Sequence, residues 1–424
     1  MDAQTYNKYT AILRAELIPA TGCTEPIALA WAAAMCRSML PSLPDKIEAW
    51  ASASIIKNVK SVVVPNTDGL KGIDAAIAAG VTVGAADREL EVLSIVPADA
   101  KRQIVEFMAK CPIHVQLANS SESFDIVLEM TAGDHSARVR IAGHHTNVVL
   151  LEQDGKILKE NQTTLESVQQ GGEDPFMTIA GIYEYANTCK LEDVEETIQR
   201  QIDCNVALSN AGLSGAWGAR IGQMLLEKGG TENILSKARA RAAAGSDARM
   251  SGCEMPAVIN SGSGNQGLTI TLPIVTYAEA MYAPHELLIR ALVFANLSSI
   301  RIKKEIGCLS AYCGAVCAGC AAGAGIGYLR GDNCGILERT IVNGLAILSG
   351  TICDGAKPSC AAKIAMSVES GVMALEMAER GNDFQGGDGI VKNTIEDTIH
   401  EVGTLSRDGM SITNEVVLNI MLGK

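Results

Sequence analysis

Aromatic side chains are scarce in this 424-residue chain: Phe, Trp and Tyr make up 4% of it, although 47% of its residues are hydrophobic. The core must therefore be built mainly from Ala, Val, Ile, Leu and Met, and such side chains favour closely packed helices. Positive charge is also in deficit, with 35 Lys and Arg against 48 Asp and Glu and a net charge of −13. Nucleic acids and anionic membranes are bound through clustered basic residues, so we expect neither as a partner.

A secretion signal is missing from the start of the sequence, MDAQTYNKYT, which has neither a basic nor an apolar segment. The expected location is the cytoplasm, where the 13 cysteines would be reduced thiols rather than disulfides. Residues 306–329 carry no charge and are long enough to span a bilayer. Their middle is mostly Ala, Gly and Cys, however, which favours a helix buried among other helices over a membrane span.

The distribution of apolar residues predicts an α+β fold. Helical spacing is found at residues 4–18, 26–40 and 72–86, and it returns after about residue 165. Strands are predicted for LEVLSIV, PIHVQL, FDIVLEM, ARVRIAG and TNVVLLE, and a helix for PADAKRQIVEFMAKC. We therefore predict a mainly α-helical domain built from both chain ends, residues 1–88 and 166–424, with a small α+β sheet domain inserted at residues 89–165.

The stretch PATGCTEP, residues 19–26, is the first candidate site. Pro26 suits the first turn of a helix, with Thr24 and Glu25 as capping residues. Cys23 would then lie at the helix N-terminus, where the helix dipole lowers the pKa of a thiol and lets it act as a base or nucleophile. The alternative is a small residue that fills a tight turn.

The loop NSGSGNQG, residues 260–267, is the second candidate, and the strand-like segment LTITLP follows it. Glycines that free the backbone, mixed with Ser and Asn donors, can hold a carboxylate or a phosphate. The lysine of a nucleotide-binding P-loop is absent. A loop without any ligand is the alternative.

Cysteines gather in two further stretches, CGAVCAGC at residues 313–320 and TICDGAKPSC at residues 351–360. The first has the spacing of radical SAM enzymes, but Cys313, Cys317 and Cys320 would share one stripe of a single helix, so one of them at most is expected to bind metal. Cys353 and Cys360 flank a turn and could face one point. Two such thiolates with a third from elsewhere suit zinc or an iron–sulfur cluster, and the spacing disfavours zinc.

The segments GCTEP, SGSGNQGLT, LSAYCGA and CDGAKPSC together resemble the L-cysteine desulfidase family, which is related to the alpha part of iron–sulfur L-serine dehydratases. The HTN sequence at residues 145–147 resembles a family signature as well. The resemblance implies a [4Fe-4S] cluster held by Cys313, Cys353 and Cys360, with Cys23 as the catalytic base. It also implies that the helical domain binds the cluster and that substrate is bound by Thr24, Glu25, Ser261, Ser263, Asn265 and Gln266.

The activity that this resemblance implies is a lyase reaction in which L-cysteine yields pyruvate, ammonia and hydrogen sulfide. A small amino acid would be the partner, and a homo-oligomer is left open. Three alternatives remain: an L-serine dehydratase with the same cluster, a pyridoxal-phosphate lyase using Lys237, and a non-catalytic cysteine or redox sensor. Against the second, SKARARAAAG around Lys237 predicts a solvent-exposed basic helix.

Overall fold

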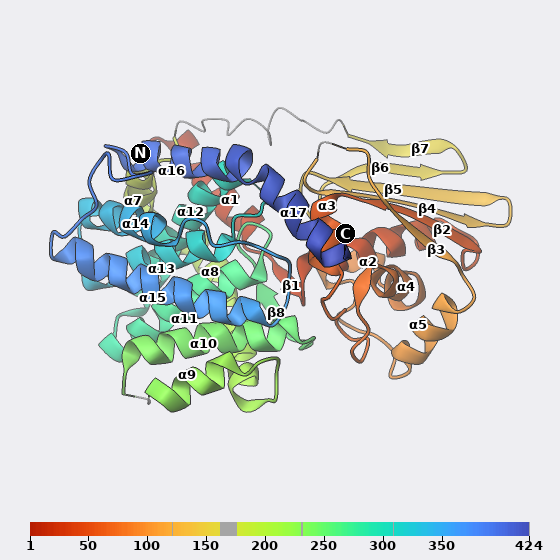
Figure 1. Ribbon diagram of the computed structural model, residues 1–424, viewed down its shortest axis with the longest axis horizontal. Helices are drawn as coiled ribbons and strands as arrows, with labels where there is room; N and C mark the ends of the chain where they lie inside the picture. The colour runs from red at the N-terminus through yellow and green to blue at the C-terminus, as the bar shows by residue number, and fades with distance from the viewer. Residues whose placement is uncertain (121, 162–175, 230–231, 308, 424) are drawn as a thin grey trace.

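The computed structural model describes residues 1–120, 122–161, 176–229, 232–307 and 309–423, and it has the α+β composition expected from the sequence (Figure 1). Helices make up most of it. In chain order they are α1 (Ala3–Glu16), α2 (Thr24–Ser38), α3 (Ala53–Val59), α4 (Gly72–Val83), α5 (Ala100–Met108), α7 (Ile179–Thr188), α8 (Leu191–Ser214), α9 (Ile221–Gly229), α10 (Ile234–Met250), α11 (Gly264–Met281), α12 (His285–Ile306), α13 (Gly314–Arg330), α14 (Cys334–Leu348), α15 (Ser359–Glu379), α16 (Ile395–Thr404) and α17 (Ser411–Leu422).

A six-stranded sheet occupies one end of the molecule, in the order β3-β2-β4-β5-β6-β7 (Figure 1). Its strands are β2 (Lys46–Ala51), β3 (Ile113–Leu117), β4 (Asp125–Ala132), β5 (His135–Ala142), β6 (Val148–Gln153) and β7 (Lys156–Glu160). Strands β2 and β3 are parallel, and all other neighbours are antiparallel. Ile126, Leu128 and Met130 alternate along β4 as fully buried residues, which is the period of a strand with one face against the core. Helices α2 and α4 contact the sheet.

Two strand predictions are wrong. LEVLSIV forms no strand; a short 3₁₀ helix (Ala86–Glu91) and turns replace it, with a positive φ of 49° at Glu89 that breaks the extended path. Leu90, Val92 and Leu93 are nevertheless buried, whereas Ile95 is exposed. LTITLP lies within α11, where all six of its residues are buried. A helix without a polar face shows no 3.6-residue period, so its Thr and Ile residues suggested a strand.

Buried side chains form two large cores. The first joins α1 to the helices after residue 176, and Tyr9 of α1 stacks on Tyr185 of α7. We call α1 and α7–α16 the helical body. The second core fills the space between the sheet and α2–α5 and draws on residues 20–148, with Met250 and Ile259. We call β2–β7 and α2–α5 the sheet body.

The predicted boundary at residue 88 lies inside this second core, because α2, β2 and α4 precede that residue and pack with the sheet. The predicted boundary at residues 165 and 166 lies outside the described residues.

Helix α13 runs through the centre of the helical body, in contact with α11, α12, α14 and α15. Its small side chains permit close approach: a Cβ on Gly371 of α15 would lie 2.0 Å from the carbonyl oxygen of Gly319 of α13. This is the close helix packing predicted from the scarcity of aromatic residues. Among the helices of the described ranges, none is long and apolar enough to cross a membrane.

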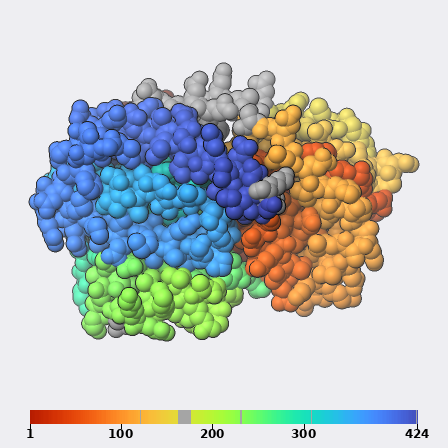
Figure 2. All heavy atoms as spheres, in the orientation of Figure 1, coloured from red at the N-terminus to blue at the C-terminus, as the bar shows by residue number. Residues whose placement is uncertain are grey.

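The two bodies meet through short pairings that connect distant parts of the chain. Strand β1 (Pro19–Thr21) pairs antiparallel with β8 (Pro256–Val258). Helix α17 leaves the helical body and contacts α3, where Lys57 Nζ donates to Asn414 Oδ1 at 2.6 Å. Figure 2 shows this last, dark blue segment across the junction of the two bodies. The candidate site lies at the same junction.

Candidate functional site

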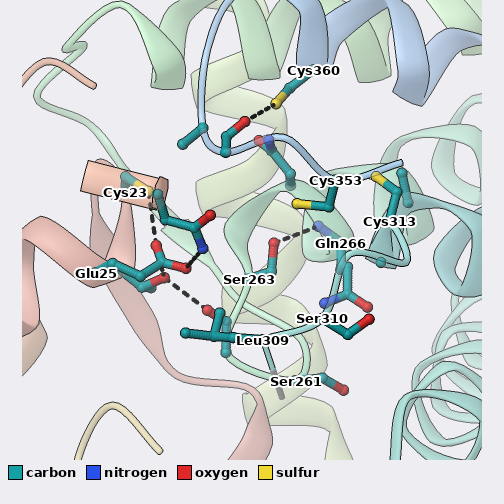
Figure 3. A pocket seen from close by; sticks show the side chains of 18 of the residues that line it. Cys23, Glu25, Ser261, Ser263, Gln266, Leu309, Ser310, Cys313, Cys353 and Cys360 are labelled. Carbon is teal, nitrogen blue, oxygen red and sulfur yellow. Dashed lines mark hydrogen bonds between the residues drawn. The ribbon is translucent and has the colours of Figure 1, made fainter. Parts of the chain in front are cut away.

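One pocket between the two bodies collects all the residues that the family resemblance assigned to cluster binding, catalysis and substrate binding (Figure 3). Figure 3 shows Cys23 and Glu25 on one side of it and the three cysteines on the other, with the glycine-rich loop between them. Ten predicted residues line it: Cys23, Thr24, Glu25, Ser261, Ser263, Asn265, Gln266, Cys313, Cys353 and Cys360. Their spatial convergence is a finding of the structure, and their roles remain predictions.

Two short segments hold Cys313 and Cys353 side by side. The Cys313 amide donates to the Thr351 carbonyl at 3.0 Å, and the Cys353 amide donates to the Ala311 carbonyl at 2.6 Å. This antiparallel bridge forms just before Cys313 caps the N-terminus of α13. Cys360 arrives from the first turn of α15, and its Sγ donates to the Gly355 carbonyl at 3.7 Å.

The three thiols differ in their surroundings: the hydrogen bond to Cys353 and burial raise the pKa of Cys313, burial raises that of Cys360, and only that of Cys353 is lowered. Cys313 donates a hydrogen bond to Cys353, and this bond, with the nearby Lys57 and Lys303 ammonium groups, lowers the pKa of Cys353 to about 5. Lys57 Nζ also donates to the Cys353 carbonyl at 3.2 Å. Thiolates are the form in which cysteine binds metal, so these contacts favour a ligand role.

Cysteine thiolates are the donors that both zinc sites and iron–sulfur clusters use. Within the described residues, no three His, Cys, Asp or Glu side chains converge closely enough to hold one metal ion. A zinc site would need its sulfurs within about 2.3 Å of a common point. An iron–sulfur cluster instead distributes its thiolate ligands over different irons, so their sulfurs stand further apart.

Cys317 and Cys320 are fully buried in α13 and do not line the pocket. Burial raises the pKa of Cys317 to about 12. The structure therefore does not bring the C-x3-C-x2-C set together on one cavity.

Cys23 differs from expectation in its protonation. It is the N-cap of α2, but its side chain makes no capping hydrogen bond. Burial and the adjacent Glu25 carboxylate raise its pKa well above the ordinary value, so the predicted low pKa is wrong for this state. The thiol donates to Glu25 Oε2 at 2.9 Å. Thr24 also donates to Glu25 Oε2, at 3.2 Å, and so does not cap the helix as predicted.

Glu25 is a buried carboxylate held by several donors. Asn58 Nδ2 donates to its Oε1 at 3.0 Å, and His145 Nε2 lies 3.9 Å from the same oxygen. Burial alone would raise the pKa of Glu25, but His145 and the Cys23 thiol outweigh it and lower the pKa below its usual range. The carboxylate is therefore ionised, and the proton of the pair resides on Cys23.

The glycine-rich loop approaches the sheet body closely. Ser261 and Gly262 have positive φ values of 49° and 75°, and a Cβ on Gly262 would lie 2.7 Å from His145 Cε1. Thr24 Oγ1 donates to the Gly262 carbonyl at 2.8 Å. Ser263 then caps α11 by accepting from the Gln266 amide. The loop thus presents the N-terminus of an 18-residue helix to the pocket, which favours an anionic ligand there.

Three cations of the pocket were missed by the sequence analysis: Arg249, Lys303 and Lys363. Arg249 is 3% exposed, and its Nη1 donates to Asn265 Oδ1 at 3.2 Å. Lys303 is 7% exposed, and among described residues its Nζ makes neither a hydrogen bond nor an ion pair. Both come from helices, α10 and α12, that reach the pocket only through tertiary folding, and their sequence surroundings gave no indication of it.

Several buried polar atoms of the pocket lack a protein partner in the described part of the chain. They are Asn58 Oδ1, His145 Nε2, Arg249 Nε and Gln266 Oε1. Native proteins rarely leave such atoms unsatisfied, so this concentration in one cavity indicates a polar ligand. Of these four residues, Gln266 was predicted to bind substrate and His145 belongs to the HTN motif, whereas the sequence analysis singled out neither Asn58 nor Arg249.

Lys237, the residue weighed for a pyridoxal-phosphate lyase, does not line the pocket and lies 4.0 Å from Glu279 as an ion pair. Its helix is less exposed than predicted: Arg241 is buried and pairs with the same glutamate at 2.8 Å.

Known proteins resemble the chain over nearly its whole length. A UPF0597 protein of Desulfitobacterium hafniense is 46% identical over 419 residues, covering 99% of this chain and 97% of that protein. UPF0597 proteins of Finegoldia magna and Lachnoclostridium phytofermentans are 44% and 43% identical, covering 98% of this chain and 99% and 100% of their own.

A family model described as serine dehydratase alpha chain matches residues 87–419. The match includes His145, the glycine-rich loop and the three pocket cysteines, whereas Cys23 and Glu25 precede it. Because the matched segment spans most of the sequence, the chain belongs to the serine dehydratase alpha chain family.

Proposed function

We propose that the chain is an iron–sulfur-dependent L-cysteine desulfidase, a lyase that converts L-cysteine to pyruvate, ammonia and hydrogen sulfide. The observation that carries the proposal is the composition of one pocket: three cysteines, a helix N-terminus with buried cations, and a separate thiol hydrogen-bonded to a carboxylate. The reaction consumes one small amino acid and one water molecule, which hydrolyses the imine left after sulfide is eliminated.

Cys313, Cys353 and Cys360 would hold a [4Fe-4S] cluster on the pocket wall. When bound by three thiolates only, such a cluster supplies an iron without a protein ligand, whose Lewis acidity weakens the bond to the leaving group. Lys57 and Lys303 compensate the negative charge of the thiolates, as their effect on the pKa of Cys353 indicates.

The substrate carboxylate would be bound at the start of α11. The helix N-terminus and the Ser263 turn offer backbone donors. Arg249 adds a buried guanidinium whose Nε has no partner among the described residues. A carboxylate bound to both would satisfy this atom and neutralise a buried charge, which costs free energy when left unpaired.

Cys23 would remove the proton from Cα. It lies opposite the three cysteines in Figure 3, so a small amino acid between them could present Cα to one side and its β-substituent to the other. Removal of this proton is difficult because the carbanion is unstable. The buried cations at the carboxylate would stabilise the developing negative charge, and such preorganised electrostatics is a major source of catalysis.

Kinetics on anaerobically purified, cluster-replete protein test the proposal. We expect kcat/KM to be higher for L-cysteine than for L-serine, because a thiolate is the better leaving group and the softer ligand for iron. Cys23→Ser should retain its iron and lose nearly all turnover.

L-serine dehydratase is the second candidate, and the family match favours it specifically. A preference for L-serine in the same assay would select that function and leave the roles of the pocket residues standing. If the purified protein showed the absorption band of bound pyridoxal phosphate, a pyridoxal-phosphate lyase would replace both candidate functions. If it turned over neither amino acid, a non-catalytic cysteine or redox sensor would be favoured.

A further inference from the structure

Glu25 was expected to bind substrate, but its carboxylate faces the protein on both sides. Oε2 accepts from the Cys23 thiol and from Thr24, and Oε1 accepts from Asn58. The side chain is 8% exposed. Its hydrogen-bonding capacity is thus mostly used by the chain itself, which leaves little of it for an amino acid.

The charged groups around this pair come from four elements. Glu25 follows Cys23 at the start of α2 and interacts with His145 on the loop between β5 and β6 and with Lys57 on α3, whereas Arg249 on α10 acts on Cys23. His145 is buried, with 4% of its surface exposed. Its Nε2 atom makes no hydrogen bond within the described ranges and lies 3.9 Å from Glu25 Oε1. One anion is therefore surrounded by cationic or ionisable donors. It is positioned for a change of protonation rather than for a substrate ammonium group.

We propose that Glu25 is the proton acceptor of Cys23: the S–H bond of Cys23 breaks, its proton forms an O–H bond with Oε2, and the electron pair remains on sulfur. This inference rests on the proposed function and deepens it. The pair carries one negative charge before and after the transfer, and the charge moves only from oxygen to sulfur. A buried pocket tolerates such an internal transfer better than it tolerates loss of a proton to solvent.

The transfer resolves a conflict within the site. A base must be a thiolate when it removes a proton, yet burial and the Glu25 carboxylate favour the thiol form of Cys23. Glu25 stores the negative charge until an amino acid with its ammonium group enters beside the sulfur and favours the thiolate. Without substrate, Cys23 then stays a thiol, which is less readily oxidised than a thiolate. Glu25 does not touch the substrate in this scheme; it controls the protonation of Cys23 and is therefore a positioning residue.

The alkylation rate of Cys23 by iodoacetamide tests the link between the two residues without substrate or cluster. Glu25→Gln removes the anion that raises the pKa of the thiol, so Cys23 should react faster at pH 7.5; each unit of lowered pKa gives about tenfold more thiolate. Glu25→Asp keeps a carboxylate and should react slowly, like the wild type. Cys36 on the same helix is fully buried and serves as the folding control, since it should stay unreactive in all three proteins.

Turnover of L-cysteine and L-serine is measured on the same variants. We expect Glu25→Gln to lose at least about tenfold in kcat although its thiol becomes more reactive, because the proton of Cys23 then has no carboxylate oxygen to move to during turnover. Glu25→Asp should recover part of kcat. If Glu25 had only a structural role, its replacement would lower both kcat and the alkylation rate of Cys23, or would make Cys36 accessible to alkylation. Unchanged alkylation in Glu25→Gln, or turnover at or above the wild-type rate, would overturn the proposal. A wild type that turns over neither amino acid would refute the proposed function, and the alkylation comparison would still decide whether Glu25 controls the Cys23 proton.

Discussion

Individual side chains of the pocket divide into those that sequence patterns identify and those that only folding reveals. Cys353, Cys360 and the glycine-rich loop were singled out by residue type and short spacing, whereas Cys313 was assigned as a ligand only through the family resemblance. Arg249 was not singled out, because it lies in an Ala- and Arg-rich helix that resembles a solvated surface. The protonation of Cys23 was also unpredictable: a helix N-terminus lowers the pKa of a thiol, but burial and the neighbouring carboxylate outweigh it here. The local sequence indicates the helix N-terminus, but it does not show how deeply the thiol is buried or that the Glu25 carboxylate accepts its proton in a hydrogen bond.

Arg249 provides a prediction at this scale. Arg249→Met should raise KM for the amino acid about 10- to 100-fold, because a hydrogen bond to a charged group contributes about 1.5–3 kcal/mol. Steady-state kinetics measure it. Lys237→Met, on the same helix and outside the pocket, is the matched control and should leave KM unchanged. Equal KM in Arg249→Met and wild type would remove the guanidinium from carboxylate binding.

Asp247 is a second buried ionisable residue, at the contact of two helices. Its Oδ2 accepts from the Gly222 amide in α9 at 2.9 Å, and burial raises its pKa to about 6. A carboxyl with a raised pKa in the folded state costs stability as pH rises from its ordinary value of about 4 through 6, since ionisation is then favoured only after unfolding.

The variant Asp247→Asn keeps the acceptor and cannot ionise. It should therefore gain stability over the wild type as pH rises from 4 to 7, by at most about 2–3 kcal/mol. Urea unfolding at several pH values measures the difference. A difference that does not change with pH would show that the Asp247 carboxyl is not destabilised by burial.

Secondary-structure elements were largely predictable where they have two distinct faces. Strands β3–β6 and helix α5 followed their predicted segments because one side of each is polar. Helix α11 was taken in part for a strand because its beginning is buried all round. The close packing of α13 was expected from the small side chains, whereas its neighbours could not be known from the sequence.

The contact of α13 with α15 can be tested directly. Gly371→Ala should lower the free energy of unfolding by about 1–3 kcal/mol, because its Cβ would overlap the Gly319 carbonyl and force the helices apart. Gly335→Ala in α14 has its nearest neighbours at 3.3 Å and beyond and is the matched control. The control should be neutral or slightly stabilising, as expected for Gly to Ala in a helix. Similar stability of both variants would argue against tight α13–α15 packing.

At the scale of the whole molecule, the site depends on how the two bodies meet. Cys23 and Glu25 begin the first helix of the sheet body, His145 comes from a loop of its sheet, and the cysteines come from the helical body. The α+β class and the presence of a sheet unit followed from the sequence. Its extent did not, because α2 and α4 have ordinary helical patterns that do not reveal their packing on the sheet. No strand was predicted at β2, which joins the sheet through long-range pairing.

The most direct test of the account is the amount of iron and of sulfide product in cysteine variants purified without oxygen. Cys353→Ser should lose both bound iron and formation of sulfide, ammonia and pyruvate from L-cysteine, because an alkoxide is a poor ligand for this iron. Cys317→Ser, which lies outside the pocket, should retain both. Wild-type protein should yield the three products in equal amounts. Full turnover by Cys353→Ser, or equal loss of iron in Cys317→Ser, would contradict the account.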